Sequence, residues 1–206
     1  MPKSPTKRRP VTVAAVLDAG LTAFLERGFH QASIHDITAA AGLTRGAFYS
    51  NFPTKEALFL AIYDRKTDDM FSELHRVLET TPKDVDAVPA LLNHVAGGAS
   101  GGDNWPLTLA EFTVHAARNA AVRADFVAHR ARSAGKLSDL ITEVAEATGR
   151  RLDTDAGELA DAILALHEGT ALLRVSRADS KRSGALFERM AAVIVDALTP
   201  VRSDRD

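Results

Sequence analysis

Hydroxyl and basic side chains gather between residues 33 and 55, where the spacing predicts the ends of short helices. Arg45 can pair with guanine O6 and N7 in a major groove, and Ala47 can contact a thymine methyl group. The hydroxyls of Thr44 and Tyr49 suit phosphate oxygens, as does the ammonium of Lys55 at a helix start. The chemistry predicted for this segment is therefore binding to double-stranded DNA. The candidate DNA-binding residues are Ser33, Thr44, Arg45, Gly46, Ala47, Tyr49, Ser50, Asn51 and Lys55.

Two short helices joined by a glycine turn are predicted to position these residues. Ser33 suits a helix N-cap, and Asp36 adds negative charge to the first turn of the helix that follows. Gly42 ends this first helix and supplies the backbone conformation of the turn. Thr44 is a second N-cap and begins a helix of about residues 44–50. This spacing is that of a helix-turn-helix.

The segment resembles the DNA-binding domain of the tetracycline-repressor (TetR) family of bacterial regulators. The resemblance covers about residues 11–65, roughly a third of the chain. It departs from the family pattern at Asn51, where many relatives carry His, and at His35, where the family position varies. The residues that carry it are 24–29 (FLERGF), Ser33, Ile34, Ile37, Ala40, Ala41, Gly42, Leu43, Thr44, Arg45, Gly46, Tyr49, Phe52, Pro53, Lys55, Glu56, Ala57 and Leu58.

The resemblance implies a role for each part of the chain. Residues matching Ser33, Thr44, Tyr49 and Lys55 usually hold phosphates in the family, whereas those matching Arg45, Gly46 and Ala47 face the bases. Three N-terminal helices serve DNA binding, and about six more form a ligand pocket and a two-fold dimer interface. The implied activity is that of a dimeric, ligand-responsive regulator of transcription, most simply a repressor.

The amino-acid composition excludes several kinds of site and several classes of protein. The 206 residues are 46% hydrophobic, which is enough for a sizeable core, and they include no cysteine. Disulfides, cysteine zinc sites and thiol catalysis are therefore excluded. No apolar run reaches about 18 residues, and the basic start of the chain lacks the apolar region of a signal peptide. We expect a cytoplasmic protein that is not an enzyme and that holds no metal or cofactor.

Charge is distributed unevenly along the chain. Residues 1–66 contain nine Lys and Arg and five Asp and Glu, whereas the remainder contains 16 and 22 respectively. A basic first third on an acidic body is typical of a polyanion-binding head. A chance asymmetry explains the charges equally simply, so this observation only supports the motif.

Apolar residues recur at helical spacing along the whole chain, and no alternating strand pattern is found. We predict an all-α protein of about nine helices. Residues 1–54 are expected to form the arm and helix-turn-helix domain, and residues 55–206 a helical ligand-binding and dimerisation domain. The expected helices are about 11–27, a short one between Ser33 and Gly42, 44–50, 55–79, 84–95, one that starts near Pro106 and carries Leu107 to Val114, 122–147, 154–176 and 183–198.

The expected body offers candidates for two further sites. Ligand pockets are mostly apolar with a few polar groups. The pocket candidates are Met70, Phe71, Leu74, Trp105, Leu109, Phe112 and His115, although plain core packing explains each of them as well. The dimer candidates lie on the apolar stripes of the last two helices, and these stripes could instead pack internally. They are Leu159, Ile163, Leu166, Leu173, Leu186, Met190 and Ile194.

Two other functions are weighed against a regulator. An all-α enzyme or small-molecule carrier that keeps the DNA-binding head as a relic would need a catalytic or metal cluster. The seven histidines are scattered and do not have the spacing of metal ligands. An adaptor that binds proteins through its acidic body would show no salt-dependent DNA binding. The glycine-rich segment 97–103 lacks the Gly-Lys-Ser/Thr of a phosphate-binding loop and is expected to be a flexible connection.

Overall fold

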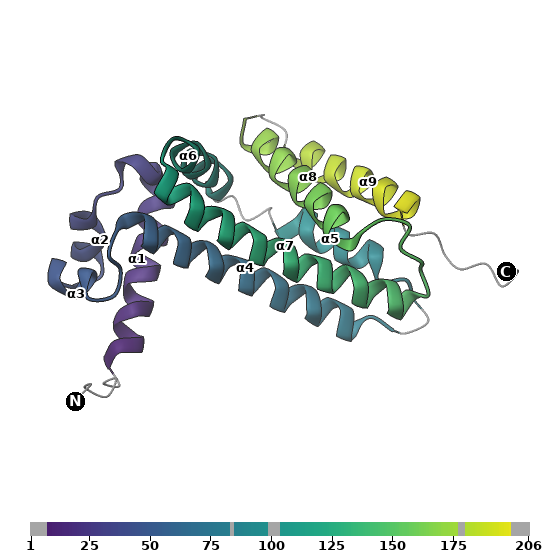
Figure 1. Ribbon diagram of the computed structural model, residues 1–206, viewed down its shortest axis with the longest axis horizontal. Coiled ribbons are helices and arrows are strands. Elements are labelled where there is room, and N and C mark those ends of the chain that lie inside the picture. The colour runs from purple at the N-terminus through teal and green to yellow at the C-terminus, as the bar shows by residue number, and fades with distance from the viewer. Residues whose placement is uncertain (1–7, 83–84, 99–103, 177–179, 199–206) are drawn as a thin grey trace, which may run out of the picture. The chain divides into compact units, whose positions relative to one another are not determined.

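Helices account for the fold, as the sequence predicts. The computed structural model describes residues 8–82, 85–98, 104–176 and 180–198, and within these ranges there are nine α-helices and no strand (Figure 1). Lys3, Lys7 and residues 99–103 of the glycine-rich segment lie outside them. The helices are α1 (Arg8–Gln31), α2 (Ile34–Ala40), α3 (Arg45–Tyr49), α4 (Lys55–Thr80), α5 (Val88–Gly98), α6 (Trp105–Arg118), α7 (Ala120–Thr148), α8 (Ala156–Ser176) and α9 (Ser180–Leu198).

The chain divides into two compact units. The first unit is the chain up to Lys66 together with Leu107–Phe126, and the second unit is Thr67–Pro106 with Val127–Asp206. The boundary expected after residue 54 therefore differs from these units, because the start of α4 and most of α6 belong with the helix-turn-helix. No described helix is long and apolar enough to cross a membrane.

An aromatic core explains why α6 joins the first unit. The Phe112 ring of α6 stacks on Phe59 of α4 at 3.9 Å between centroids, and its other contacts include edge-on packing against Phe29 and Phe126. Thr108 of α6 is also buried, and its hydroxyl donates to the Phe24 carbonyl over 3.1 Å. This core is assembled from segments more than 80 residues apart, so its helix pairing could not be predicted from local patterns.

The turn after α1 depends on Gly28. Its φ of 76° and ψ of 167° lie outside the helical region, so the regular helix stops there as predicted and a short helical segment continues to Gln31. A side chain at this position would begin 2.6 Å from a carboxylate oxygen of Glu111. The backbone conformation therefore requires glycine, and any side chain here would also displace the Glu111 carboxylate.

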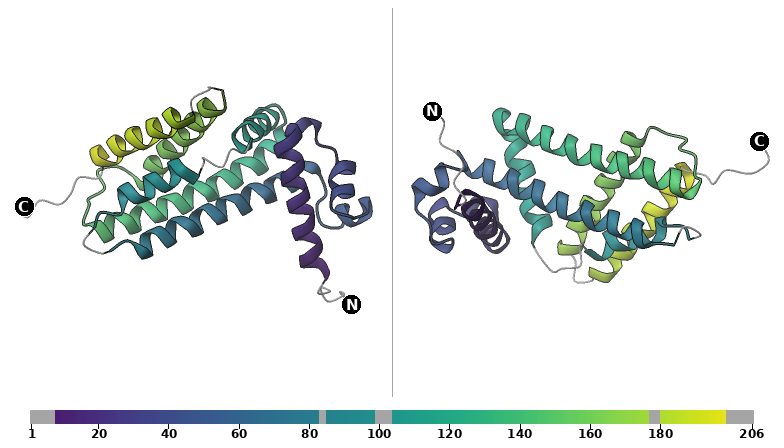
Figure 2. Two further views of the ribbon diagram at one scale, coloured as in Figure 1. Left: turned by 180° about the vertical axis from the view of Figure 1, so that it is seen from behind. Right: turned by 90° about the horizontal axis from the view of Figure 1, so that it is seen from below.

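The second unit has its own apolar core. α9 packs against both α8 and α5, and the two last helices run side by side in the ribbon views (Figures 1 and 2). α5 begins later than expected, at Val88, because the Asp86 carboxylate accepts the Val88 N–H over 3.0 Å and caps the helix. The core includes Phe71, Leu74, Leu91, Leu92, Leu137, Leu140, Val144, Leu159, Ile163, Phe187 and Val195.

Replacing Gly28 tests the break in α1. Gly28→Ala is expected to lower the free energy of unfolding by about 1–3 kcal/mol, because alanine resists this backbone conformation even if the Glu111 side chain moves away. The midpoint of urea denaturation, followed by circular dichroism, measures the change.

Gly135→Ala is the matched control. Gly135 is an exposed helical residue of α7 with no atom within 4 Å of the added carbon, so this variant should gain about 0.5–1 kcal/mol. If both variants shifted the midpoint equally and in the same direction, the strain assigned to Gly28 would be wrong.

Candidate DNA-binding interface and ligand cavity

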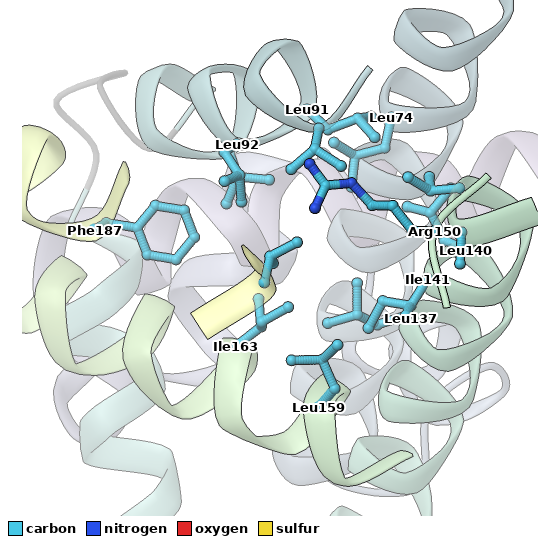
Figure 3. A pocket seen from close by; sticks show the side chains of 15 residues that line it. Leu74, Leu91, Leu92, Leu137, Leu140, Ile141, Arg150, Leu159, Ile163 and Phe187 are labelled. Carbon is cyan, nitrogen blue, oxygen red and sulfur yellow. The ribbon is translucent and has the colours of Figure 1, made fainter. Parts of the chain in front are cut away.

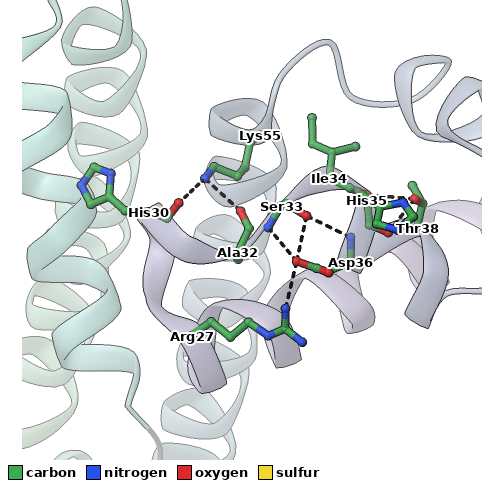
Figure 4. Close-up of polar contacts among 9 residues, drawn as sticks. All are labelled: Arg27, His30, Ala32, Ser33, Ile34, His35, Asp36, Thr38 and Lys55. Carbon is green, nitrogen blue, oxygen red and sulfur yellow. Dashed lines mark hydrogen bonds and ion pairs between the residues drawn. The ribbon is translucent and has the colours of Figure 1, made fainter.

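Reciprocal hydrogen bonds fix the start of α2 (Figure 4). The Ser33 hydroxyl accepts the Asp36 N–H over 3.1 Å and donates to the Asp36 carboxylate over 2.7 Å. Arg27 pairs with the same carboxylate at 2.9 Å. The hydrogen bond from Ser33 lowers the pKa of Asp36 against slight desolvation, with Arg27 assisting. Ser33 is thus a helix cap, as predicted, and a phosphate contact would compete for its hydroxyl proton.

α3 is held by similar contacts at both ends. The Thr44 hydroxyl oxygen accepts the Ala47 N–H over 3.2 Å, which leaves the hydroxyl hydrogen available as a donor. At the other end Ser50 and Asn51 each donate over 2.8 Å to carbonyls of the helix, those of Gly46 and Ala47. The Ser50 hydroxyl proton and one of the two Asn51 amide protons are therefore used locally, in contrast to the Thr44 hydroxyl proton.

An exposed face remains along α3, from its first residue to its last. Arg45 and Gly46 are exposed, and Tyr49 keeps 48% of its surface accessible while its ring packs edge-on against Phe48. Phe48 and Ile37 are completely buried and anchor the two short helices. The arrangement presents a guanidinium, a small backbone surface and a phenol together, which suits base edges and phosphates.

Lys55 has a structural role that its sequence position does not reveal. Its ammonium donates to the carbonyls of Phe29, His30 and Ala32 at 2.7, 3.3 and 3.0 Å. It also lies 4.5 Å from the Phe29 ring centroid. Burial lowers the pKa of this amine, although the nearby Glu56 and Glu111 oppose the shift. Three donors serve three carbonyls, so a phosphate could bind only by replacing one of these hydrogen bonds.

An apolar cavity of about 90 Å³ lies within the second unit (Figure 3). Its walls come from five helices, α4, α5, α7, α8 and α9, and from the turn after α7. Of the seven pocket candidates, Leu74 alone lines it. Met70 and Phe71 pack in the core of the same unit, and Trp105 is not part of the wall.

The remaining three candidates belong to the first unit. Phe112 is completely buried in the aromatic core, and His115 lies 3.2 Å from the Glu56 carboxylate. Leu109 also falls in this unit. Helical spacing placed them on α6 correctly but could not indicate which core that helix enters.

Arg150 is a cavity residue that the sequence analysis missed. It is the one charged residue among those lining the cavity, and its side chain is only 9% exposed. Its guanidinium pairs with Asp86 at 2.7 Å and Asp196 at 3.0 Å. Burial opposes its charge, but these two carboxylates raise the pKa of Arg150. The only signal in the sequence is an arginine beside Gly149, which predicts no partner.

The dimer candidates on α8 and α9 divide into buried and exposed residues. Leu159 and Ile163 are 1% and 9% exposed and line the cavity, so they are not available to a partner, contrary to expectation. Leu166 and Ile194 are partly buried against the same core, and Leu173 and Leu186 are also partly buried. Met190 is 40% exposed, and its neighbour Val193, absent from the predicted set, is 61% exposed.

Comparison with known proteins agrees with this geometry. Residues 16–62 match the model of bacterial regulatory proteins of the tetR family. The HTH-type transcriptional repressor DhaR of Mycobacterium sp. (strain GP1) is 27% identical over 90% of this chain and 91% of its own. The HTH-type transcriptional activator FasR of Mycolicibacterium smegmatis is 33% identical over 32% of this chain and 30% of its own.

The similarity of fold extends beyond the matched segment. A TetR-family transcriptional regulator from Cytophaga hutchinsonii superposes with a TM-score of 0.73 at 20% identity, covering 97% of this chain and all of that structure. The relatives are regulators of transcription and not enzymes. With the helix-turn-helix geometry and the nine-helix arrangement of the described residues, these matches identify residues 16–62 as a tetR-family DNA-binding segment and support a TetR-family regulator of transcription.

Proposed function

We propose that this regulator is a repressor that binds a near-palindromic operator as a dimer and is released by a small, largely apolar ligand. The observation that carries the proposal is the exposed face of α3, with Arg45 and Tyr49 four residues apart on a helix anchored by the buried Phe48. Such an operator lies on bacterial chromosomal DNA, so we expect the protein to act in the cytoplasm.

Base reading is assigned to the start of α3. Arg45 is proposed to pair with a guanine, while Gly46 and Ala47 let the backbone approach the groove. Thr44 and Tyr49 are proposed to donate to phosphates, as is Ser33 when its hydroxyl turns away from Asp36. Ser50 is proposed to act mainly by stabilising the end of α3, since its hydroxyl proton is already engaged, whereas Asn51 keeps a second amide proton for a phosphate.

A face of small residues supports dimerisation. Ala162, Ala165 and Gly169 are exposed at spacings of three and four along α8, and Leu172 continues the same stripe. Met190 and Val193 add exposed apolar surface on α9, which packs beside α8. Small residues permit close helix approach, and a two-fold dimer would present its α3 helices about 34–36 Å apart or at a multiple of this spacing.

The cavity of the second unit is the proposed ligand site. Its lining is almost entirely apolar, as that of small-molecule sites usually is. A ligand that favours the state with the wrong spacing of the two α3 helices would lower DNA affinity by linkage. The named relatives include a repressor and an activator, so the sign of regulation is a separate test.

Arg45 and Tyr49 form a matched pair for testing DNA recognition. Arg45→Ala should change the preferred base at one position in each half-site, with a loss of about 1–3 kcal/mol at that contact. Tyr49→Phe should weaken binding to all DNA sequences alike, by about 0.5–1.5 kcal/mol, because a phosphate contact carries no sequence information.

Selection from random DNA duplexes, followed by titration at several salt concentrations, measures both effects. An unchanged base preference in the Arg45 variant would remove Arg45 from the base-reading set. Absence of saturable, salt-sensitive binding by the unaltered protein would contradict the proposed function itself.

Substitution of Lys55 distinguishes a structural role of this side chain from a phosphate-binding role. Lys55→Met should lower the free energy of unfolding by about 2–3 kcal/mol, because three carbonyls lose a charged donor. If Lys55 only stabilises the folded protein, the slope of the logarithm of DNA affinity against the logarithm of salt concentration should be the same in Lys55→Met as in the unaltered protein. A slope reduced by about one, with little change in the melting temperature, would instead assign Lys55 to a phosphate.

The dimer face can be tested without disturbing the core. Ala165→Glu and Val193→Glu should each yield a monomer in sedimentation velocity experiments, because both sites are exposed in the single chain and would bury a charge in the interface. Val127→Glu is the control, since Val127 is exposed on α7. A dimer that survives both α8 and α9 variants would require another interface.

A further inference from the structure

Charge compensation at Arg150 limits what the cavity can hold. One guanidinium faces two carboxylates, so the group Asp86, Arg150 and Asp196 carries a net charge of −1. An anionic ligand reaching Arg150 would meet both carboxylates, and a cationic one would meet the guanidinium inside an apolar wall. The carboxylates that could neutralise a cation are 42% and 66% exposed and do not line the cavity, so a charged ligand inside the apolar wall would lack a compensating partner there, and isolated charges are very costly in such surroundings. The arrangement favours a ligand with no charge.

Arg150 also forms a wall between the cavity and a groove outside. The groove has a volume of about 360 Å³ and is lined by polar residues that include Thr142, Glu146 and Arg151. Arg150 and Ala145 line both the groove and the apolar cavity. Figure 3 shows the Arg150 side chain reaching across one end of the cavity toward Leu91. A molecule passing from the groove into the cavity must therefore pass these two residues.

The size of the cavity requires movement on binding. Its volume of about 90 Å³ is smaller than the ~150 Å³ apolar cavity that admits benzene in an engineered protein. The other lining side chains are apolar and are held by close packing. Arg150 is held instead by ion pairs with Asp86 and Asp196, whose side chains are 42% and 66% exposed. Its guanidinium can move toward the groove and remain hydrated, which no buried leucine can do.

We propose that the cavity takes an uncharged, compact apolar molecule, and that Arg150 is the gate through which this molecule enters from the groove. Opening the gate breaks the ion pairs to Asp86 and Asp196. Identifying this molecule with the effector rests on the proposed function, whereas binding and gating do not.

The ion pairs of Arg150 connect it to α9 and to the start of α5. Asp196 lies on α9, which carries the exposed Met190 and Val193. Asp86 caps α5, which packs against α9. Displacing Arg150 therefore removes a restraint on α9 and on the start of α5 at the same time. An occupied cavity would in this way alter the helix proposed to meet the second copy.

Fluorine NMR of the full chain without DNA tests the ligand class. The probes are 4-fluorotoluene, 4-fluorobenzoate and 4-fluorobenzylammonium, which share a ring and differ in charge. We expect saturable binding of 4-fluorotoluene alone, and its loss in Ile141→Phe, which adds volume to the cavity wall. Equal or tighter binding of 4-fluorobenzoate would make Arg150 an anion-binding residue and overturn the proposal. No binding of 4-fluorotoluene would also overturn it.

Exchange rates of the same probe test the gate. Asp196→Asn removes the charge of one gate partner while preserving its shape, and Asp139→Asn is an exposed control on α7 outside the group. Weakening an exposed ion pair should speed association of 4-fluorotoluene by up to about fivefold in Asp196→Asn and leave it unchanged in the control. Equal rates in the two variants would refute the gate. Binding and gating without any effect on DNA affinity would refute only the effector role.

Discussion

The two helices that are proposed to meet DNA are too short to be stable alone. α2 has seven residues and α3 has five, whereas isolated helices below about 12–15 residues are marginal in water. Burial of Ile37 and Phe48 and the caps at Ser33 and Thr44 therefore hold them in place. The exposed Arg45 and Tyr49 are positioned only because this small core is intact, and every property proposed for the interface depends on it.

The aromatic core beside these helices is completed by a segment from much later in the chain. Phe112 and Thr108 of α6 enter the first unit, and Glu111 occupies the space beside Gly28. The Lys55 ammonium then joins the start of α4 to the carbonyls after Gly28. The end of α1 is thus fixed by contacts with α4 and α6. A displacement of α6 would therefore shift the end of α1, which immediately precedes α2.

The second unit combines two kinds of interaction with different responses to a ligand. Close packing of leucine, isoleucine and phenylalanine side chains resists small changes in volume. The ion pairs of Arg150 lie at the boundary with water and can exchange protein partners for solvent. A site built from both can exclude water while retaining one movable wall. The buried position of Leu159 and Ile163 supports this division, because it assigns the inner stripe of α8 to the cavity and leaves the outer stripe exposed.

The sequence by itself determined the helical class, the position of the helix-turn-helix and its caps, because these depend on neighbours within four residues. Ser33, Gly28 and Thr44 were predicted in this way. Tertiary structure alone decided the partners of Lys55, the unit to which Phe112 belongs and the role of Arg150, since each depends on residues 23 or more positions away. Periodicity also located the apolar stripe of α8. It could not indicate which residues face the core, because an inner and an outer apolar face have the same spacing along one helix.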